Sequence, residues 1–262
     1  MNPIAYQDFL DELVSTLGAD PRVLGLIALG STADAASRDR WSDHDFWVIT
    51  SPGAQSRYLE TFSWLPQSER ILIAVRHGLS HRTALYENKH KAEYAVFDSE
   101  EAVRGKIERF EVLIDRADIG RLAESIRLRT HEERASALSK PDMLEHLCLI
   151  LWTACERRLR GEHLSAQRYD QFAVDAFLNL LVAHGRLGES QAADGLDARR
   201  RLEQREPELA RELSRVVGLG PADAGVALID FAEKELRPTA PGLAWQRASV
   251  VKRWLREAAE AA

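Results

Sequence analysis

The sequence predicts an α+β protein in which a mixed-sheet domain is followed by a domain of helices. Short apolar runs of strand length alternate with helical patterns in the first half of the chain, which is typical of a small mixed sheet. Strand-like runs end before residue 119, and from residue 143 apolar side chains recur at the i, i+3, i+4 spacing of helices. These observations predict domains over residues 1–134 and 135–262, the second a helical bundle.

The elements of the first half follow from apolar patterning and turn residues. Apolar positions at helical spacing predict a helix over residues 4–17, which Gly18 ends. Pro52 and Gly53 close the second apolar run, and a helix over residues 55–65 is expected after them. Strands are expected at residues 23–29, 46–50, 70–75, 82–86, 92–97 and 109–114.

The second half contains helical patterns separated by Gly and Pro. Helices are expected at residues 143–159, 167–187, 197–206, 208–217, 223–236 and 246–262. Cys148 and Cys155, the two cysteines of the chain, lie in the first of these helices. Because no cluster of His or Cys surrounds them, we expect them to pack in the core rather than bind a metal or form a disulfide.

A Gly-Ser pair and an Asp-x-Asp pair stand at the ends of two predicted strands. Gly30 and Ser31 follow the first strand, and Asp43 and Asp45 open the second after a polar spacer. Residues i and i+2 of a strand point to the same face, so the two carboxylates can meet at one Mg²⁺ ion. Gly30 lets the backbone approach a phosphate, and Ser31 adds a hydroxyl and an N–H group. The pattern predicts a site for a metal and a phosphate.

Three polar residues near these strands have different expected roles. Glu93 interrupts an apolar strand, where a carboxylate needs an ion partner, water at a sheet edge, or a metal. It can be a third metal ligand, a base that takes a proton from a hydroxyl, or a solvated edge charge. Asp98 is expected to cap a short helix. His44, between the two aspartates, is expected to point to the opposite face and pack in the core.

Composition limits the partners. The chain has 262 residues, 45% of them hydrophobic, and a formal net charge of −6. This charge gives no basic field that would hold a long nucleic acid, so we expect a small acceptor molecule. The longest apolar run, residues 147–155, is far shorter than the ~18 residues of a membrane span, and the first residues show no charged and apolar leader. We therefore expect a cytoplasmic protein without a membrane partner.

The Gly-Ser and Asp-x-Asp motif resembles that of the nucleotidyltransferase superfamily typified by DNA polymerase β. Length and layout are most similar to the lincosamide and aminoglycoside antibiotic nucleotidyltransferases. The stretches that carry this likeness are residues 29–31 with 41–46, residues 86–88 with 92–98 and 104–105, and residues 151–152 with 160–162. The resemblance implies a mixed-sheet catalytic domain, a helical domain and a substrate cleft between them. It also makes Asp43, Asp45 and Glu93 the acidic set.

The resemblance further implies a reaction. A nucleoside monophosphate, with AMP favoured, would pass from ATP or another NTP to a hydroxyl of a small molecule such as a lincosamide or aminoglycoside, releasing pyrophosphate (EC 2.7.7). Such an activity would confer antibiotic resistance. Asp43 and Asp45 would bridge two Mg²⁺ ions, and Glu93 would serve as a ligand or general base.

Phosphate anchoring also needs cations. The candidates are Arg38 and Arg40 in the spacer, and Arg157, Arg158, Arg160 and Arg168 in the helical half. We assign Arg38 and Arg158 to the nucleotide, although the sequence does not single out one helical arginine. Two other functions stay open: a non-catalytic module, such as an antitoxin-type or nucleotide-sensing domain, and nucleotide transfer to a protein. The sequence is compatible with a homodimer.

Overall fold

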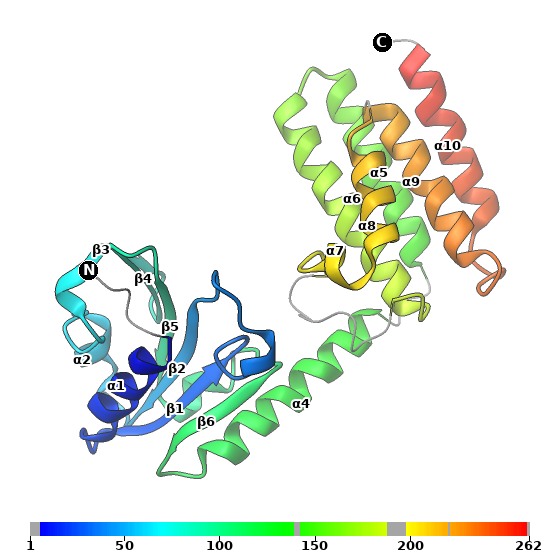
Figure 1. The fold of residues 1–262 in the computed structure, drawn as a ribbon. Coiled ribbons are helices and arrows are strands. Elements are labelled where there is room, and N and C mark those ends of the chain that lie inside the picture. Colours follow the sequence, from blue (N-terminus) through cyan, green and yellow to red (C-terminus); the bar gives the residue numbers. More distant parts are fainter. Residues whose placement is uncertain (1–5, 139–141, 188–197, 220, 261–262) are drawn as a thin grey trace. The chain divides into compact units, whose positions relative to one another are not determined.

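The computed structural model describes residues 6–138, 142–187, 198–219 and 221–260 (Figure 1). The chain divides into two compact units, unit 1 over Met1–Glu133 and unit 2 over Arg134–Ala262. Unit 1 contains a six-stranded mixed sheet, and the described part of unit 2 is helical. The α+β class predicted from the sequence is therefore confirmed. The assignment of nucleotidyl transfer to residues 1–134 stays a prediction.

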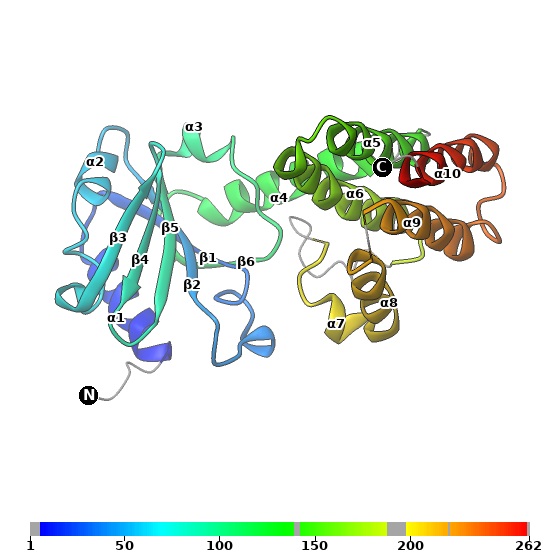
Figure 2. The same cartoon turned by 90° about the horizontal axis from the view of Figure 1, so that it is seen from above.

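The strands of unit 1 form one sheet in the order β3-β4-β5-β2-β1-β6. Parallel pairing joins β2 to β5, and the other neighbouring pairs are antiparallel (Figure 2). Each strand begins and ends within two residues of its predicted bounds. The strands are β1 (Val23–Leu29), β2 (His44–Thr50), β3 (Ile71–His77), β4 (His81–Tyr86), β5 (Lys91–Phe97) and β6 (Phe110–Asp115).

Helices cover both faces of this sheet. α1 (Tyr6–Gly18) packs on one face, where its Phe9 is buried together with Phe46 of β2. α4 (Ile119–Leu138) packs on the other face, over the core that contains Trp47 of β2. Successive residues of β2 thus enter opposite cores, as the two-residue period of a strand requires. This alternation also decides which face each residue at the start of β2 occupies.

The first short helix of unit 1 differs from its expected length. The sequence predicts a helix over residues 55–65, but α2 spans only Gln55–Leu59, so the second half of that prediction is wrong. The indole N–H of Trp64 donates to the carbonyls of Tyr58 and Thr61, each at 3.1 Å. These side-chain hydrogen bonds satisfy carbonyls that a further helical turn would otherwise use.

The short helix after β5 begins as predicted. Asp98 is the N-cap of α3 (Ser99–Ala102), and its carboxylate accepts hydrogen bonds from the backbone N–H groups of Glu100 and Glu101. The Glu101 side chain in turn accepts a hydrogen bond from the Asp98 backbone, which completes a capping box. A structural role for Asp98 is therefore confirmed.

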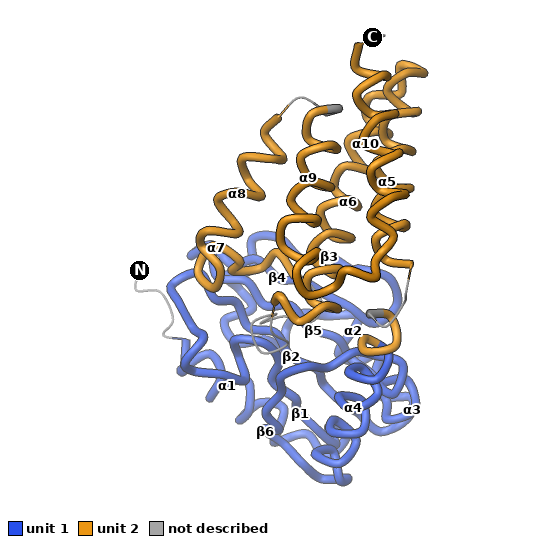
Figure 3. Tube along the Cα trace, turned by 90° about the vertical axis from the view of Figure 1, so that its right-hand side faces the viewer, with its two compact units in different colours: residues 1–133 blue, residues 134–262 orange. Residues whose placement is uncertain are grey.

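Unit 2 is built around one apolar core. The long helices α5, α6, α9 and α10 lie side by side (Figure 3). Cys148 and Cys155 are unbonded to each other and buried in this core, which confirms their predicted packing role. The helices are α5 (Met143–Leu159), α6 (His163–Ala183), α7 (Leu202–Arg205), α8 (Pro207–Val217), α9 (Pro221–Leu236) and α10 (Trp245–Glu260).

Two helices of unit 2 differ by more than two residues from their expected bounds. α6 begins at His163 rather than at residue 167, and it ends at Ala183 because Gly185 takes up the left-handed region with φ +69°. α7 is shorter than the predicted helix over 197–206. Parts of the helices expected at 4–17, 197–206 and 246–262 lie outside the described residues. None of the described helices combines the length and apolar character needed to cross a membrane.

Candidate metal centre

Three carboxylates meet at one end of the sheet in unit 1. Asp45 of β2 and Glu93 of β5 are register partners on adjacent parallel strands, and Asp43 precedes Asp45 by two residues. The strand period therefore places all of them on one face. One ligand oxygen from each lies within 4.8 Å of the others, and each residue is partly exposed. The structure thus brings together the whole predicted acidic set; its role stays a prediction.

A lysine that the sequence analysis missed lies among these carboxylates. The Nζ atom of Lys91 is 2.8 Å from Asp43 Oδ2 and 2.9 Å from Glu93 Oε1. Burial alone would lower the pKa of Lys91, but the hydrogen bonds with Asp43 and Glu93 outweigh it and raise that pKa above its ordinary value. Lys91 stands two residues before Glu93, so the same strand period that predicts a shared face for the aspartates could have found it.

The Gly-Ser turn ends β1 directly beside the acidic cluster. Leu29 of β1 is the register partner of Asp45, and Gly30 follows with φ +54°, a conformation that favours glycine. A Cβ atom at Gly30 would lie 3.5 Å from Asp45 Oδ2. Ser31 is only 5% exposed, and its hydroxyl has no hydrogen-bond partner among the described residues. A buried hydroxyl of this kind is suited to a ligand oxygen.

Two hydroxyl groups fix the backbone that carries the aspartates. Thr32 is fully buried, and its Oγ1 accepts a hydrogen bond of 2.8 Å from the Asp45 N–H group. The Tyr6 hydroxyl of α1 lies 2.8 Å from the Asp43 carbonyl and 3.0 Å from Thr32 Oγ1. Neither residue was predicted from the sequence, because α1 and the turn meet the aspartates only through the fold.

His44 lies on the opposite face from the aspartates, as predicted. It is fully buried, stacked between Tyr6 and Phe9, and hydrogen-bonded through Nε2 to the Tyr6 carbonyl at 3.1 Å. Since a carbonyl only accepts, Nε2 carries the proton, and Nδ1 accepts from His90 Nε2 at 3.0 Å. Burial lowers the pKa of His44 to about 3. The interpretation as a packed core histidine is confirmed.

Arg38, one of the predicted phosphate contacts, is hydrogen-bonded to the backbone of the Gly-Ser turn. Its Nε donates to the Ser31 carbonyl at 3.1 Å, and its Nη2 donates to the Thr32 carbonyl at 2.7 Å. The guanidinium also lies over the Tyr6 ring, 4.9 Å from its centroid. Arg38 therefore belongs to the same local framework as the turn, and its contact with a nucleotide stays a prediction.

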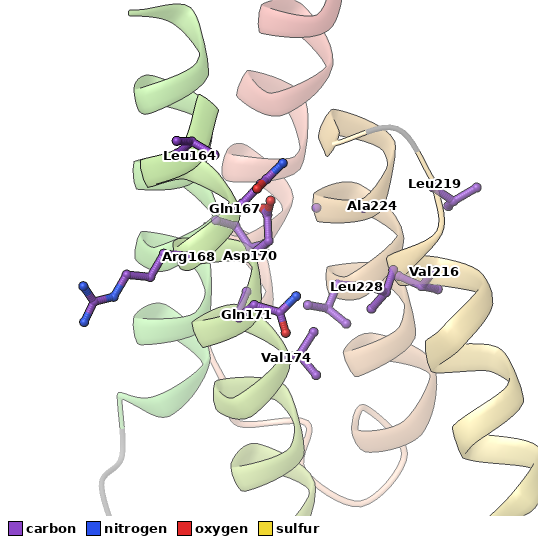
Figure 4. Close-up of a pocket in the computed structure, with 14 residues that line it drawn as sticks. Leu164, Gln167, Arg168, Asp170, Gln171, Val174, Val216, Leu219, Ala224 and Leu228 are labelled. Carbon is purple, nitrogen blue, oxygen red and sulfur yellow. The ribbon is translucent and has the colours of Figure 1, made fainter. Parts of the chain in front are cut away.

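The other predicted phosphate contact, Arg158, belongs to α5 in unit 2. Its guanidinium pairs there with Asp170 of α6. Asp170 lines a cavity of about 530 Å³ whose wall also includes Val174 and Leu228. Figure 4 shows that Arg168, assigned above as an alternative, points away from these labelled apolar residues. Arg158 thus has a carboxylate partner within unit 2, and its contact with phosphate stays a prediction.

The donor atoms of the cluster suit a hard divalent cation. Carboxylate oxygens are the preferred protein ligands of Mg²⁺, and Asp43, Asp45 and Glu93 offer one each from a common face. The unpaired Ser31 hydroxyl stands at the adjoining turn, where a phosphate accompanying the metal would need a donor. The residues present therefore fit a metal ion with a phosphate ligand.

Solved structures include one that the chain resembles over nearly its whole length. No protein-family model matches the chain, and no curated protein matches it. Among solved structures, the chain is similar to an aminoglycoside 6-adenyltransferase from Bacillus subtilis, with 12% identity and a TM-score of 0.40. The match covers 98% of this chain and 99% of that one.

Proposed function

We propose that the protein transfers a nucleoside monophosphate from an NTP to a hydroxyl group of a small molecule and releases pyrophosphate. The observation that carries this proposal is the convergence of Asp43, Asp45 and Glu93 on one face, with the Gly30–Ser31 turn beside them. In this reaction an acceptor oxygen bonds to the α-phosphorus while the bond from that phosphorus to the bridging oxygen breaks. Such a displacement depends on positioning and on neutralising phosphate charge.

The residues divide this work by position. Asp43 and Asp45 would hold Mg²⁺, one ion or two, which neutralises phosphate charge and makes the acceptor hydroxyl easier to deprotonate. Glu93 has a side chain that is 46% exposed, so an acceptor can reach it. It would take the proton of the attacking hydroxyl or share in metal binding. The Ser31 hydroxyl would donate a hydrogen bond to a phosphate oxygen, while Arg38 holds the turn in place.

The acceptor is proposed to be a small hydroxylated molecule, and lincosamide and aminoglycoside antibiotics are the classes to test first. The net charge of −6 supports a small acceptor over a long nucleic acid. ATP is the proposed donor, which would make AMP the transferred group. A cytoplasmic location, a homodimer and a role in antibiotic resistance belong to the same proposal.

Pyrophosphate release tests the proposal directly. The full chain is incubated with MgCl₂, with ATP, GTP, CTP or UTP, and with a panel of lincosamides and aminoglycosides. The control is the variant Asp43→Asn/Asp45→Asn, whose folding is checked by circular dichroism. Release that requires an acceptor and is lost in this variant supports the proposal. Equal release by the folded variant would show that these aspartates do not carry the reaction.

One observation favours a second function, a non-catalytic nucleotide-binding module. Lys91 already supplies a positive charge to Asp43 and Glu93, as in a site that needs no metal. A protein of this kind would bind a nucleotide without releasing pyrophosphate to any acceptor. Titration calorimetry with ATP, in MgCl₂ and then in EDTA, separates the two functions, because only the proposed transferase should need the metal.

A further inference from the structure

Lys91 occupies the position between two of the proposed metal ligands. Asp43 precedes β2 and Asp45 is its second residue, while Glu93, the register partner of Asp45, follows Lys91 by two residues on the parallel neighbour β5. All four side chains therefore share one face, and the Lys91 ammonium bridges Asp43 Oδ2 and Glu93 Oε1 at 2.8 and 2.9 Å. Two of the three carboxylates that would bind a metal, those of Asp43 and Glu93, are therefore the groups that now bind this ammonium.

Binding a divalent cation beside this ammonium costs free energy. The two cations repel each other at such short range, and Asp43 Oδ2 and Glu93 Oε1 would lose their ion pairs with Lys91 when they turn to the metal. Free metal must therefore displace Lys91. A metal that arrives with a triphosphate brings several negative charges, to which the displaced ammonium can bind instead.

The Lys91 side chain has the freedom to make this move. It is the first residue of β5, its side chain is 40% exposed, and both of its ion pairs are with side chains rather than with the backbone. A lysine carries its charge on a flexible four-carbon stem, so the ammonium can leave the carboxylates while the strand stays in register. By contrast, Arg38 is held by two backbone carbonyls.

We propose that Lys91 is a displaceable counter-ion that makes the site select a metal–nucleotide complex over free metal. In the absence of ligand, its ammonium fills the cation position between Asp43 and Glu93. When the metal–nucleotide complex binds, the ammonium passes to the triphosphate. This inference rests on the proposed function, because it takes the three carboxylates to be a metal centre.

The test compares two affinities whose changes have opposite signs. Binding of Mn²⁺ alone and of Mn²⁺ with the non-hydrolysable α,β-methylene analogue of ATP is measured by calorimetry for the wild type and for Lys91→Met. Mn²⁺ takes the same oxygen ligands as Mg²⁺. We expect Lys91→Met to bind free Mn²⁺ about tenfold more tightly and the Mn²⁺–nucleotide complex about tenfold more weakly. A purely structural lysine would move both affinities in the same direction.

Two further variants control for charge and folding. Lys106→Met removes the same charge from an exposed lysine of unit 1 that pairs with Glu133 at 3.5 Å, and it should change neither affinity. If Lys91→Met fails to fold, Lys91→Gln removes the charge but can still hydrogen-bond to both carboxylates, and the same opposite shifts are expected. Unchanged or weakened Mn²⁺ binding in a folded Lys91 variant overturns the inference.

Mn²⁺ binding by the aspartate double variant distinguishes this inference from the proposed function. If Asp43→Asn/Asp45→Asn binds Mn²⁺ as tightly as the wild type does, the carboxylates are not a metal centre, and both proposals fail. If Mn²⁺ binding needs the aspartates but is indifferent to Lys91, the proposed function stands and only the counter-ion role is wrong.

Discussion

The two units differ in what they bury. Among the described residues, every buried polar or charged side chain lies in unit 1: Ser31, Thr32, His44, Thr50, Arg82 and Thr130. The buried side chains described in unit 2 are apolar or cysteine. Burying a polar group costs free energy unless it is hydrogen-bonded, so such groups persist where they hold something in place. In unit 1, Thr32 is hydrogen-bonded to the Asp-x-Asp segment, and His44 is the middle residue of that segment.

This difference explains why the sequence of unit 1 indicates chemistry while that of unit 2 indicates packing. The buried hydroxyl of Thr32 fixes the backbone N–H of Asp45, so its position is tied to the site. In unit 2, charged side chains pair with one another at or near the surface, as Arg157 does with Glu162. Such pairs contribute little and do not specify a ligand. We therefore expect a substitution in the core of unit 2 to leave Mn²⁺ binding at the carboxylates of unit 1 unchanged.

The largest expected effect on stability comes from opening the core of unit 2. Phe177 is fully buried, and its ring centroid lies 5.1 Å from that of Phe231. Phe177→Ala should lower the free energy of unfolding of unit 2 by about 3–5 kcal/mol. This loss is measured by urea unfolding, with chemical labelling of Cys148 and Cys155 as the signal, because both cysteines lie in unit 2.

The rate of cysteine labelling at pH 8 reports the unfolding of unit 2. Burial raises the pKa of Cys148 to about 12 and also raises that of Cys155, so at pH 8 both are protonated in the folded unit and react slowly. Unfolding returns each pKa to its ordinary value, and the labelling rate rises. Phe172→Ala is the matched control, because Phe172 lies on the same helix but is 41% exposed. Mn²⁺ affinity that falls in parallel with the stability of unit 2 would contradict the separation of the units.

How far the site was predictable depends on the range of the contacts that build it. The period of two placed Asp43 and Asp45 on one face from sequence alone. The position of Glu93 beside them needs β2 and β5 to be neighbours, which only the family resemblance suggested. Lys91 was not predicted although it obeys the same period, because an ammonium group is not a metal ligand and its place among the carboxylates depends on the pairing of β5 with β2.

The remaining residues of the site depend on contacts that no local pattern reveals. Tyr6 reaches the Asp43 carbonyl from a helix 37 residues earlier in the chain. Conversely, Arg158 looks like a free cation in the sequence, but helix packing gives it Asp170 as a partner. The fold itself was more predictable than the site, since strands and long helices follow from apolar periodicity within each segment.

The next expected effect tests the chemistry assigned to unit 1. If Glu93 is the general base, Glu93→Gln should lower turnover by about 10²-fold, equivalent to about 2.7 kcal/mol of barrier, while Mg-ATP affinity stays nearly level. Turnover and calorimetric affinity are measured on the same preparation. The matched control is Glu87→Gln, in the turn before β5, where Glu87 is 54% exposed and lies 4.0 Å from Arg70.

The pattern of change in Glu93→Gln identifies the role of this residue. A joint fall of turnover and metal-dependent affinity would make Glu93 chiefly a metal ligand. If neither quantity changes with a competent acceptor, Glu93 does not belong to the site. Of the three carboxylates, only Asp43 and Asp45 would then remain in it.

A smaller effect comes from the buried hydroxyls that distinguish unit 1. Thr32→Val keeps the shape of the side chain but leaves the Asp45 N–H group without its acceptor, which should cost about 1–3 kcal/mol of stability. Thr130→Val is the matched control, because Thr130 Oγ1 accepts from the Ile107 N–H group at 3.3 Å. Both variants should lose stability in urea, but only Thr32→Val should also weaken Mn²⁺ binding. Equal Mn²⁺ affinities would show that Thr32 supports the fold and not the site.

The smallest effect concerns the turn that adjoins the carboxylates. Gly30 and Gly53 both have positive φ, +54° and +81°, so alanine at either position should cost about 1–2 kcal/mol through backbone strain. The added Cβ atom meets nothing within 4 Å at Gly53, but at Gly30 it lies 3.5 Å from Asp45 Oδ2. That distance is an ordinary contact, so Asp45 keeps its position while the space beside its carboxylate narrows. Thermal unfolding should therefore show similar losses, whereas calorimetry should show weaker metal–nucleotide binding only for Gly30→Ala. If Gly53→Ala weakens binding equally, the loss arises from general strain in unit 1, and Gly30 has no particular part in admitting a phosphate.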